Sequence, residues 1–430
     1  MKRTPRLVIL SAFSIPPVSR AASGGVAGTV RPVADVSSGD VPTLGRVVEV
    51  LEAIYPPETA QDWDAVGLVC GDPDAGVRRV LLALDPVAEV VDEAIETGAD
   101  LLLVHHPLLL RGVHSMAATS FKGRALHRLV RAGCALYVAH TNADAAVPGV
   151  SDALARVLGL QDLVPLSPEP AEALDKLVLF APDGDAERVL DAVAAAGAGR
   201  IGEYSRCAWT TSGTGTFVPG DRSRPTRGSA GRREEVAETR VEMVMPRASR
   251  NAVVAAMRGA HPYEEPAFDV FELARWSGPR GIGRVGRLAR PTTLERFAMS
   301  VAEVLPHTPQ GVRVAGDLNA PVSTVAVCGG SGDSLFDAVR ASGADAFVTA
   351  DLRHHPASEA REQARGGPPY LVDVAHWASE WPWLHGCAER LATGLAAADG
   401  SAGDTVETVV SARRTDPWTF RLPSSGGLVR

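Results

Sequence analysis

Val80-Leu-Leu-Ala-Leu-Asp85, followed by Leu101-Leu-Leu-Val-His-His-Pro107, is the stretch that decides the fold. Both runs are short and apolar, which is typical of buried strands, and residues 87–97 between them have a helical pattern. A strand, a helix and a second strand in this order predict a βαβ unit. His105 and His106 then stand at the end of the second strand, the edge at which α/β sheets place their sites.

The same pattern recurs late in the chain. Val325-Ala-Val-Cys-Gly-Gly330 is predicted to be a strand, residues 335–339 belong to a helix, and Ala346-Phe-Val-Thr-Ala-Asp351 is predicted to be the second strand. A Gly-Ala-Asp triplet precedes the second strand in both units, and both units end in His-His-Pro, here His354-His355-Pro356. We interpret this recurrence as an internal duplication. The alternative is that two ordinary βαβ units look alike by chance.

The sequence between the two units has a different pattern. Strands are predicted at 177–181, 208–211, 239–245 and 267–273, and helices at 186–196 and 252–260. The order βαβ–βαβ is that of a small ferredoxin-like domain. Residues 212–233 are rich in Gly, Ser, Arg and Pro, so a long flexible loop or hairpin is predicted there.

The predicted fold class is therefore α/β (α+β): a duplicated three-layer βαβ-type domain with an inserted ferredoxin-like domain. An amphipathic helix, with apolar residues from Leu44 to Ile54 at helical spacing, opens the first half. The predicted boundaries are 1–40 for a disordered leader or a misassigned start, 41–168 for the first half, 172–275 for the insertion, 280–415 for the second half and 416–430 for a tail. For the leader, a weak secretory signal is the alternative.

Composition excludes some classes of function. The chain has 430 residues, 45% of them hydrophobic, and a net charge of −8, which argues against a surface built to bind nucleic acid or anionic lipid. It has no apolar run of about 18 residues, so no membrane span is expected. Five separated cysteines without a CxxC motif predict reduced, mostly buried thiols and a cytoplasmic location.

Two segments near strand ends carry residues capable of chemistry. His105 and His106 precede a proline that turns the chain and can direct both side chains toward one cavity. A pair of capped surface histidines is the alternative. Residues 139–144 follow another apolar run and provide His140 and the carboxylate of Asp144, although Asp144 is equally natural as a helix N-cap.

A third segment adds one imidazole and one carboxylate. His376 and Glu380 are four residues apart and would share one face of a helix. Pro382 disfavours helical geometry at the residue before it, so a helix and a loop both stay open. The three segments together supply the candidate imidazoles His105, His106, His140 and His376 and the carboxylates of Asp144 and Glu380, from which three imidazoles and two carboxylates would make a set of five ligands.

Mixed nitrogen and oxygen ligands suit divalent Zn, Fe, Mn or Co. Five protein ligands are about right for two ions that share a bridging carboxylate and keep open positions for water. Such a pair lowers the pKa of a bridging water, which then acts as the nucleophile in hydrolysis. The sequence therefore predicts a site for two divalent metal ions.

Several motifs in the right order resemble the GTP cyclohydrolase I type 2 homologues, also called NGG-interacting-factor-3-like dinuclear metal proteins. The resemblance runs from about residue 42 to residue 420. Its motifs are Asp62-Trp63-Asp64-Ala-Val-Gly67-Leu68, Leu103-Val-His105-His106-Pro107, Ala139-His140-Thr141-Asn142-Ala143-Asp144, His261-Pro-Tyr-Glu-Glu-Pro266 and His376-xxx-Glu380. The sequence departs from the family pattern at Ala350 and Ala375, where the family usually has glycine.

The resemblance implies a ligand set and an assembly. Its five metal ligands match His105, His106, Asp144, His376 and Glu380, and Glu380 resembles the ligand that bridges both ions. The family forms a toroidal homohexamer, and its long members carry an inserted domain similar to PII or CutA proteins. His354 and His355 match residues that line the family's cavity, where a role with substrate or in proton transfer competes with a structural one.

Two functions of different classes follow. The first is a metal-dependent hydrolase that acts on a nucleotide or another phosphate-bearing small molecule. The second is a non-catalytic metal-binding regulatory or interaction protein whose inserted domain senses a small molecule. Gly329-Gly330-Ser331-Gly332 adds a smaller choice between a phosphate-binding loop and a tight turn between strand and helix.

Overall fold

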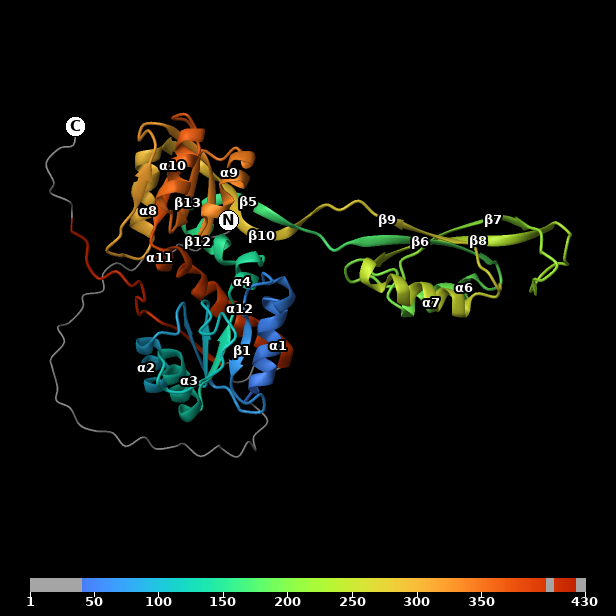
Figure 1. The fold of residues 1–430 in the computed structure, drawn as a ribbon, viewed down its shortest axis with the longest axis horizontal. Coiled ribbons are helices and arrows are strands. Elements are labelled where there is room, and N and C mark those ends of the chain that lie inside the picture. The colour runs from blue at the N-terminus through green and yellow to red at the C-terminus, as the bar shows by residue number, and fades with distance from the viewer. Residues whose placement is uncertain (1–40, 400–405, 423–430) are drawn as a thin grey trace, which may run out of the picture.

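The computed structural model describes residues 41–399 and 406–422, so the predicted leader and the last residues of the predicted tail lie outside it. Within these residues the chain forms a mixed α/β structure with three sheets. Two sheets with their helices form the main body, and the third projects from it at the end of a long ribbon (Figure 1). None of the described helices combines the length and apolar character needed to cross a lipid bilayer.

The first sheet contains the predicted early βαβ unit. Its strand order is β1(Gly67–Cys70), β4(Ala135–Val138), β3(Leu101–Val104), β2(Arg79–Ala83) and β15(Glu407–Val410). All neighbours are parallel except β1 and β4. The helix α2(Ala88–Glu96) connects β2 to β3, as predicted. Parallel strands covered on both faces explain why these sequences are continuous apolar runs.

Helices cover both faces of this sheet. On one face, α1(Leu44–Ile54) and α12(Pro382–Asp399) pack against the sheet through a core that contains Leu82 and Leu103. On the other, α2 and α3(Phe121–Ala132) pack against neighbouring residues of the same strands. The helix predicted over residues 44–54 is confirmed, and the Thr43 side chain caps it by accepting a hydrogen bond from the backbone N–H of Arg46.

The second sheet contains the late unit. Its strand order is β11(Arg313–Ala315), β14(Tyr370–Val374), β13(Ala346–Ala350), β12(Pro321–Ser331), β10(Ser277–Thr293) and β5(Leu160–Pro170). The strands β12 and β13 are parallel and joined through α9(Phe336–Ser342), as predicted. Separate cores on the two faces include residues of α5(Val150–Val157) and α8(Leu294–Val304) on one side, and of α9 and α10(His354–Gln363) on the other.

The third sheet lies in the segment between the two units. Its order is β7(Trp209–Phe217), β8(Glu234–Pro246), β6(Leu174–Pro182) and β9(Phe268–Glu272), all antiparallel. The helices α6(Ala186–Ala195) and α7(Arg250–Ala260) share a core with one face of this sheet. The antiparallel strands β5 and β10 form the ribbon that leads to it (Figure 1).

Of the loop and the hairpin predicted for residues 212–233, the structure has the hairpin, because the first part of this range is a strand. The strand β7 continues to Phe217 and pairs with β8 from Trp209 onward, which leaves residues 218–233 as the connection. Sequence patterning predicted only the start of this strand, at residues 208–211, because most of its side chains are exposed and no apolar alternation marks the rest. At Gly215 a Cβ atom would meet the carboxylate of the Glu238 side chain, which would have to move.

Candidate metal centre

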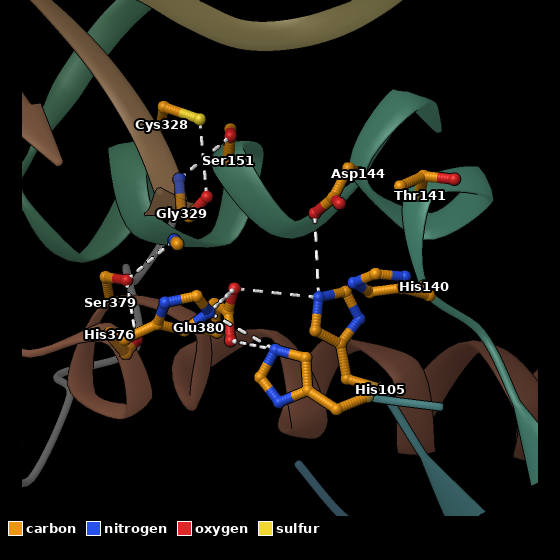
Figure 2. Close-up of polar contacts among 12 residues, drawn as sticks. His105, His140, Thr141, Asp144, Ser151, Cys328, Gly329, His376, Ser379 and Glu380 are labelled. Atoms are coloured by element: carbon orange, nitrogen blue, oxygen red, sulfur yellow. Dashed lines mark hydrogen bonds and ion pairs between the residues drawn. The ribbon is translucent and has the colours of Figure 1, made fainter. Parts of the chain in front are cut away.

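The candidate site lies where strands of both halves end. His105 and His106 follow β3, and His140 follows the parallel neighbour β4. Because the carboxyl ends of parallel strands meet at one edge, these three imidazoles come close together. Asp144 comes from the short helix α4(Thr141–Ala145) directly after β4. Figure 2 shows the Asp144 and Glu380 carboxylates on two sides of the His105 ring.

The segment that sequence patterning left open is helical. Residues His376–Glu380 form α11, and His376 Nε2 lies 3.0 Å from Glu380 Oε1 at the spacing of one helical turn. Trp381 keeps helical dihedral angles although a proline follows it. Pro382 opens the next helix, where its missing N–H removes no helical hydrogen bond. The short helix α11 therefore directs the His376 and Glu380 side chains toward each other.

Glu380 is the centre of the cluster. Its carboxylate is almost fully buried and lies 3.0 Å from His376 Nε2, 3.2 Å from His106 Nε2 and 3.7 Å from His105 Nε2. Gly330 makes this approach possible, because a Cβ atom on that residue would overlap Glu380 Oε1. The Gly330 N–H donates to Ser379 Oγ at 2.9 Å. The Gly-rich turn is therefore a close-packing element, and this N–H is not free to bind a phosphate.

Each imidazole of the cluster has an outer partner at Nδ1. These partners are Ala139 O for His105 (2.8 Å), Asp85 Oδ1 for His106 (2.8 Å), Asp64 Oδ1 for His140 (2.8 Å) and Asp351 Oδ2 for His376 (2.7 Å). Carbonyl and carboxylate oxygens only accept, so Nδ1 of each ring carries the proton. In a neutral ring this leaves the Nε2 lone pair free, the arrangement found when histidine binds a metal.

The resulting cluster contains acceptor atoms without hydrogen-bond partners among the described residues. His106 Nε2 and His376 Nε2 are 3.2 Å apart, and in the neutral form that can bind a metal the two rings cannot hydrogen-bond to each other there, because both protons are on Nδ1. Buried His105 Nε2 and Glu380 Oε2 have no hydrogen-bond partner. Such atoms are costly to bury unless something satisfies them. A cation would satisfy all four atoms, so the residues fit a metal ion.

Two groups of three side chains have ligand atoms within 4.8 Å of one another: His105, His106 and His140, and His106, His376 and Glu380. Four of the five residues predicted as ligands thus fall in these groups. The fifth, Asp144, lies beside them, with Oδ1 3.7 Å from His105 Nε2. Burial raises the pKa of Asp144, and the nearby imidazole of His105 partly offsets that effect.

The other predicted residues have different surroundings. His354 and His355 are exposed at the start of α10, where their rings contact each other. No group of metal-ligating side chains found among the described residues contains either of them. Trp63 is exposed, and its ring meets the His140 ring edge-on at 5.9 Å.

Sequence patterns did not mark Asp85 or Asp351 as partners of the metal-ligating histidines. Asp85 ends the first predicted strand of the early unit, and Asp351 ends the second predicted strand of the late unit. For both residues, the signal available in the sequence was a carboxylate at the end of a predicted strand. Only the fold shows that each of them reaches a histidine of the cluster.

Electrostatics make the cluster attractive to positive charge. Burial opposes protonation of His106, but the Glu380 carboxylate and the hydrogen bond to Asp85 outweigh it and raise its pKa to about 10. The same balance, with Asp351 as the partner, raises the pKa of His376 to about 11. Burial alone would raise the pKa of Glu380, yet the charges of His106 and His376 hold it well below its usual range.

Metal binding should therefore release protons. Glu380, Asp85 and Asp351 favour the protonated imidazoles of His106 and His376 in the metal-free protein, whereas metal ligands must be neutral, so we expect protons to leave on metal binding. The apparent affinity should rise with pH until it levels off above the two pKa values. Calorimetric Zn²⁺ titrations in buffers of different ionisation enthalpy measure this release. A binding heat that does not depend on the buffer would contradict it.

The carboxylates that accept from the Nδ1 atoms should affect the affinity of the cluster for a metal ion. We expect Asp85→Asn to weaken Zn²⁺ binding about 10- to 100-fold, because the amide is a poorer acceptor for the His106 Nδ1–H and the ring loses basicity. Competition with a chromophoric chelator measures the change. Asp74→Asn, on an exposed turn, is the matched control and should bind as wild type. Equal Zn²⁺ affinities for Asp85→Asn and the wild type would contradict the prediction.

Comparisons with known proteins agree on one family. The sequence matches the family model Duf34/NIF3 (NGG1p interacting factor 3) over residues 42–417. It is 51% identical over 378 residues to a Mycobacterium tuberculosis protein named "GTP cyclohydrolase 1 type 2 homolog", covering 88% of this chain and 97% of that one. A Bacillus subtilis protein of the same name is 36% identical over 375 residues, covering 87% and 98%.

Solved structures also include a protein related to NIF3. A Bacillus cereus protein related to NIF3 superposes with a TM-score of 0.68 at 36% identity, covering 89% of this chain and all of that one. A Staphylococcus aureus protein superposes with a TM-score of 0.75 at 28% identity and the same coverage. The likeness therefore spans both halves and the inserted segment.

Proposed function

The chain belongs to the Duf34/NIF3 (NGG1p interacting factor 3) family, and from this premise we propose that it is a metal-dependent hydrolase acting on a nucleotide or another phosphate-bearing small molecule. The observation that carries the proposal is the partly buried cluster of imidazoles with protonated Nδ1 atoms around the buried Glu380 carboxylate. The nucleotide part rests on the name of the relatives, "GTP cyclohydrolase 1 type 2 homolog".

In this proposal five side chains hold two divalent ions of Zn, Fe, Mn or Co. They are His105, His106, Asp144, His376 and Glu380. When bound, such ions polarise the substrate and activate water for hydrolysis. Asp85 and Asp351 keep His106 and His376 in the required tautomer and orientation. Burial of Glu380 keeps bulk water away from its carboxylate, which strengthens its attraction for cations.

The proposal has a direct test. Purified full-length protein is stripped with a chelator, reloaded separately with Zn²⁺, Mn²⁺, Fe²⁺ or Co²⁺, and incubated with GTP, GMP and simple phosphoesters. We expect turnover that disappears on stripping, returns on reloading and is lost in Glu380→Ala. Stoichiometric metal binding without turnover across the panel would favour the alternative, a non-catalytic metal-binding regulatory protein.

Two finer features complete the proposal. We assign the third sheet with α6 and α7 to a ferredoxin-like insertion, supported by its strand order β7-β8-β6-β9, in which the two βαβ units interlock. We also propose that the chain assembles as a ring-shaped homohexamer, an expectation from the family resemblance alone. Light scattering coupled to size-exclusion chromatography tests the assembly, and a monomeric mass would exclude it.

A further inference from the structure

The C-terminal segment, residues 411–422, crosses from the first half to the second beside the metal centre. Its start is held where the Ser411 N–H donates to Leu82 O at 2.8 Å and Ser411 Oγ donates to Glu93 Oε2 at 2.7 Å. Farther along, Thr415 Oγ1 donates to Asp85, the outer partner of His106. In Figure 1 the segment is the red chain that runs from β15 toward the second half. It therefore borders the cluster from outside.

The far end of this segment forms one wall of a cleft. The cleft has a volume of about 560 Å³, within the range of small-molecule sites. Trp418, Phe420 and Arg421 line it from the C-terminal segment, and Gln310, Arg313 and Asp351 line it from the second half. Asp351 also hydrogen-bonds to His376, so the cleft lies one residue away from the cluster.

The aromatic side chains of this wall are exposed to solvent. Trp418 is 63% exposed and Phe420 is 74% exposed, although both line the cleft. A segment that served only to strap the two halves together would bury its aromatic side chains, because burial of such rings is what stabilises the contact. Two uncovered aromatic side chains in a cleft can instead stack on a planar ring, a contact that every nucleobase can make.

The charges of the cleft favour an anion at Arg421. Of the other charged residues that line the cleft, Arg313 is engaged, because its Nε donates to Asp373 Oδ2 at 2.7 Å, and Asp351 accepts from His376. Arg421 donates one N–H to Gln310 O at 3.1 Å and makes no ion pair within the described residues. Its guanidinium keeps further donors that suit the oxygens of a phosphate.

We propose that this cleft binds an aromatic heterocycle that carries a phosphate group, with Trp418 stacking on the ring and Arg421 binding the phosphate. This inference deepens the proposed function, because the cleft would deliver such a substrate to the metal centre.

Binding to the full-length, metal-stripped protein tests the subsite without any need for activity. The probes are GMP, which has both ring and phosphate, and inorganic phosphate, which lacks the ring; calorimetry measures both. We expect Trp418→Ala to weaken GMP binding about tenfold or more, the effect of losing one base stack, and to leave phosphate binding unchanged. Arg421→Gln should weaken both ligands, and Trp418→Phe should restore much of the GMP affinity.

Matched controls and outcomes keep the inference separate from the proposed function. Trp276→Ala and Arg290→Gln, exposed residues elsewhere, should bind GMP as wild type. Wild-type GMP affinity in both Trp418→Ala and Arg421→Gln, or no GMP binding at all, would overturn the inference, even if the metal-loaded protein turns over. GMP binding that depends on Trp418 in a protein without turnover would support the subsite and count against the hydrolase.

Discussion

Glu380→Gln is expected to abolish stable metal loading. The carboxylate lies within 3.7 Å of three imidazole nitrogens and is the one carboxylate in the two groups of candidate ligands found in the described part of the chain. The glutamine side chain has nearly the same shape but no charge, so attraction for a dication falls while packing is kept. Since losing an outer partner alone costs 10- to 100-fold in affinity, we expect a loss of more than about 100-fold.

Metal content by elemental analysis, together with a chelator competition, measures this loss. Glu389→Gln, at an exposed position of α12, is the matched control and should load as wild type. Circular dichroism of both variants checks that the fold is intact. Full metal content in a folded Glu380→Gln protein would remove the basis for the proposed centre, and with it the observation that carries the proposed function.

Arg284→Met is expected to lower the free energy of unfolding by about 3–5 kcal/mol, because it leaves a buried carboxylate without its counter-charge. Arg284 is 1% exposed, and its Nη2 lies 2.8 Å from Asp152 Oδ2. Nη2 also donates to Ala146 O at 2.6 Å, which ties β10 to the chain just after α4. The pair therefore holds in place the helix that carries Asp144, so the variant should also load metal less well.

Urea unfolding followed by tryptophan fluorescence measures the loss in Arg284→Met. Arg290→Met is the matched control, since Arg290 is exposed on the same strand and should cost little. The double variant Arg284→Met with Asp152→Leu should recover part of the stability, because no isolated charge remains buried. Asp152 Oδ2 also accepts from the Gly149 N–H, so recovery should stay incomplete. A loss below about 1 kcal/mol in the single variant would contradict the prediction.

Much of the main body could be predicted from local pattern. The strands from Arg79 to Ala83 and from Leu101 to Val104 are buried on both faces, so their sequences are unbroken apolar runs that indicate parallel strands. The strand from Trp209 to Phe217 could not be predicted to its full length. Its stability comes from backbone pairing with β8, and an exposed Thr- and Gly-rich strand leaves no mark in hydrophobic periodicity.

Some residues of the candidate site could likewise be predicted from the sequence, and others could not. His105, His106, His376 and Glu380 could be selected because imidazole and carboxylate groups stood at predicted strand or helix ends, and the structure brings these four together. His140 was selected as a candidate but left out of the ligand set, and its Asp64 partner lies 76 residues away in the chain. Local sequence patterns do not reveal which carboxylate accepts from which ring when the two residues are far apart in the chain.

The sequence by itself determined which side chains could bind a cation and that they would stand at the ends of elements, because local propensity and hydrophobic burial act over a few residues. Only the tertiary structure decided which nitrogen of each ring faces the cluster, since that depends on Asp85, Asp351 and Asp64. It also decided that residues assigned to a tail, among them Trp418 and Arg421, line a cleft beside the cluster. Hydrogen bonds and cleft walls form between atoms close in space, whatever their separation along the chain.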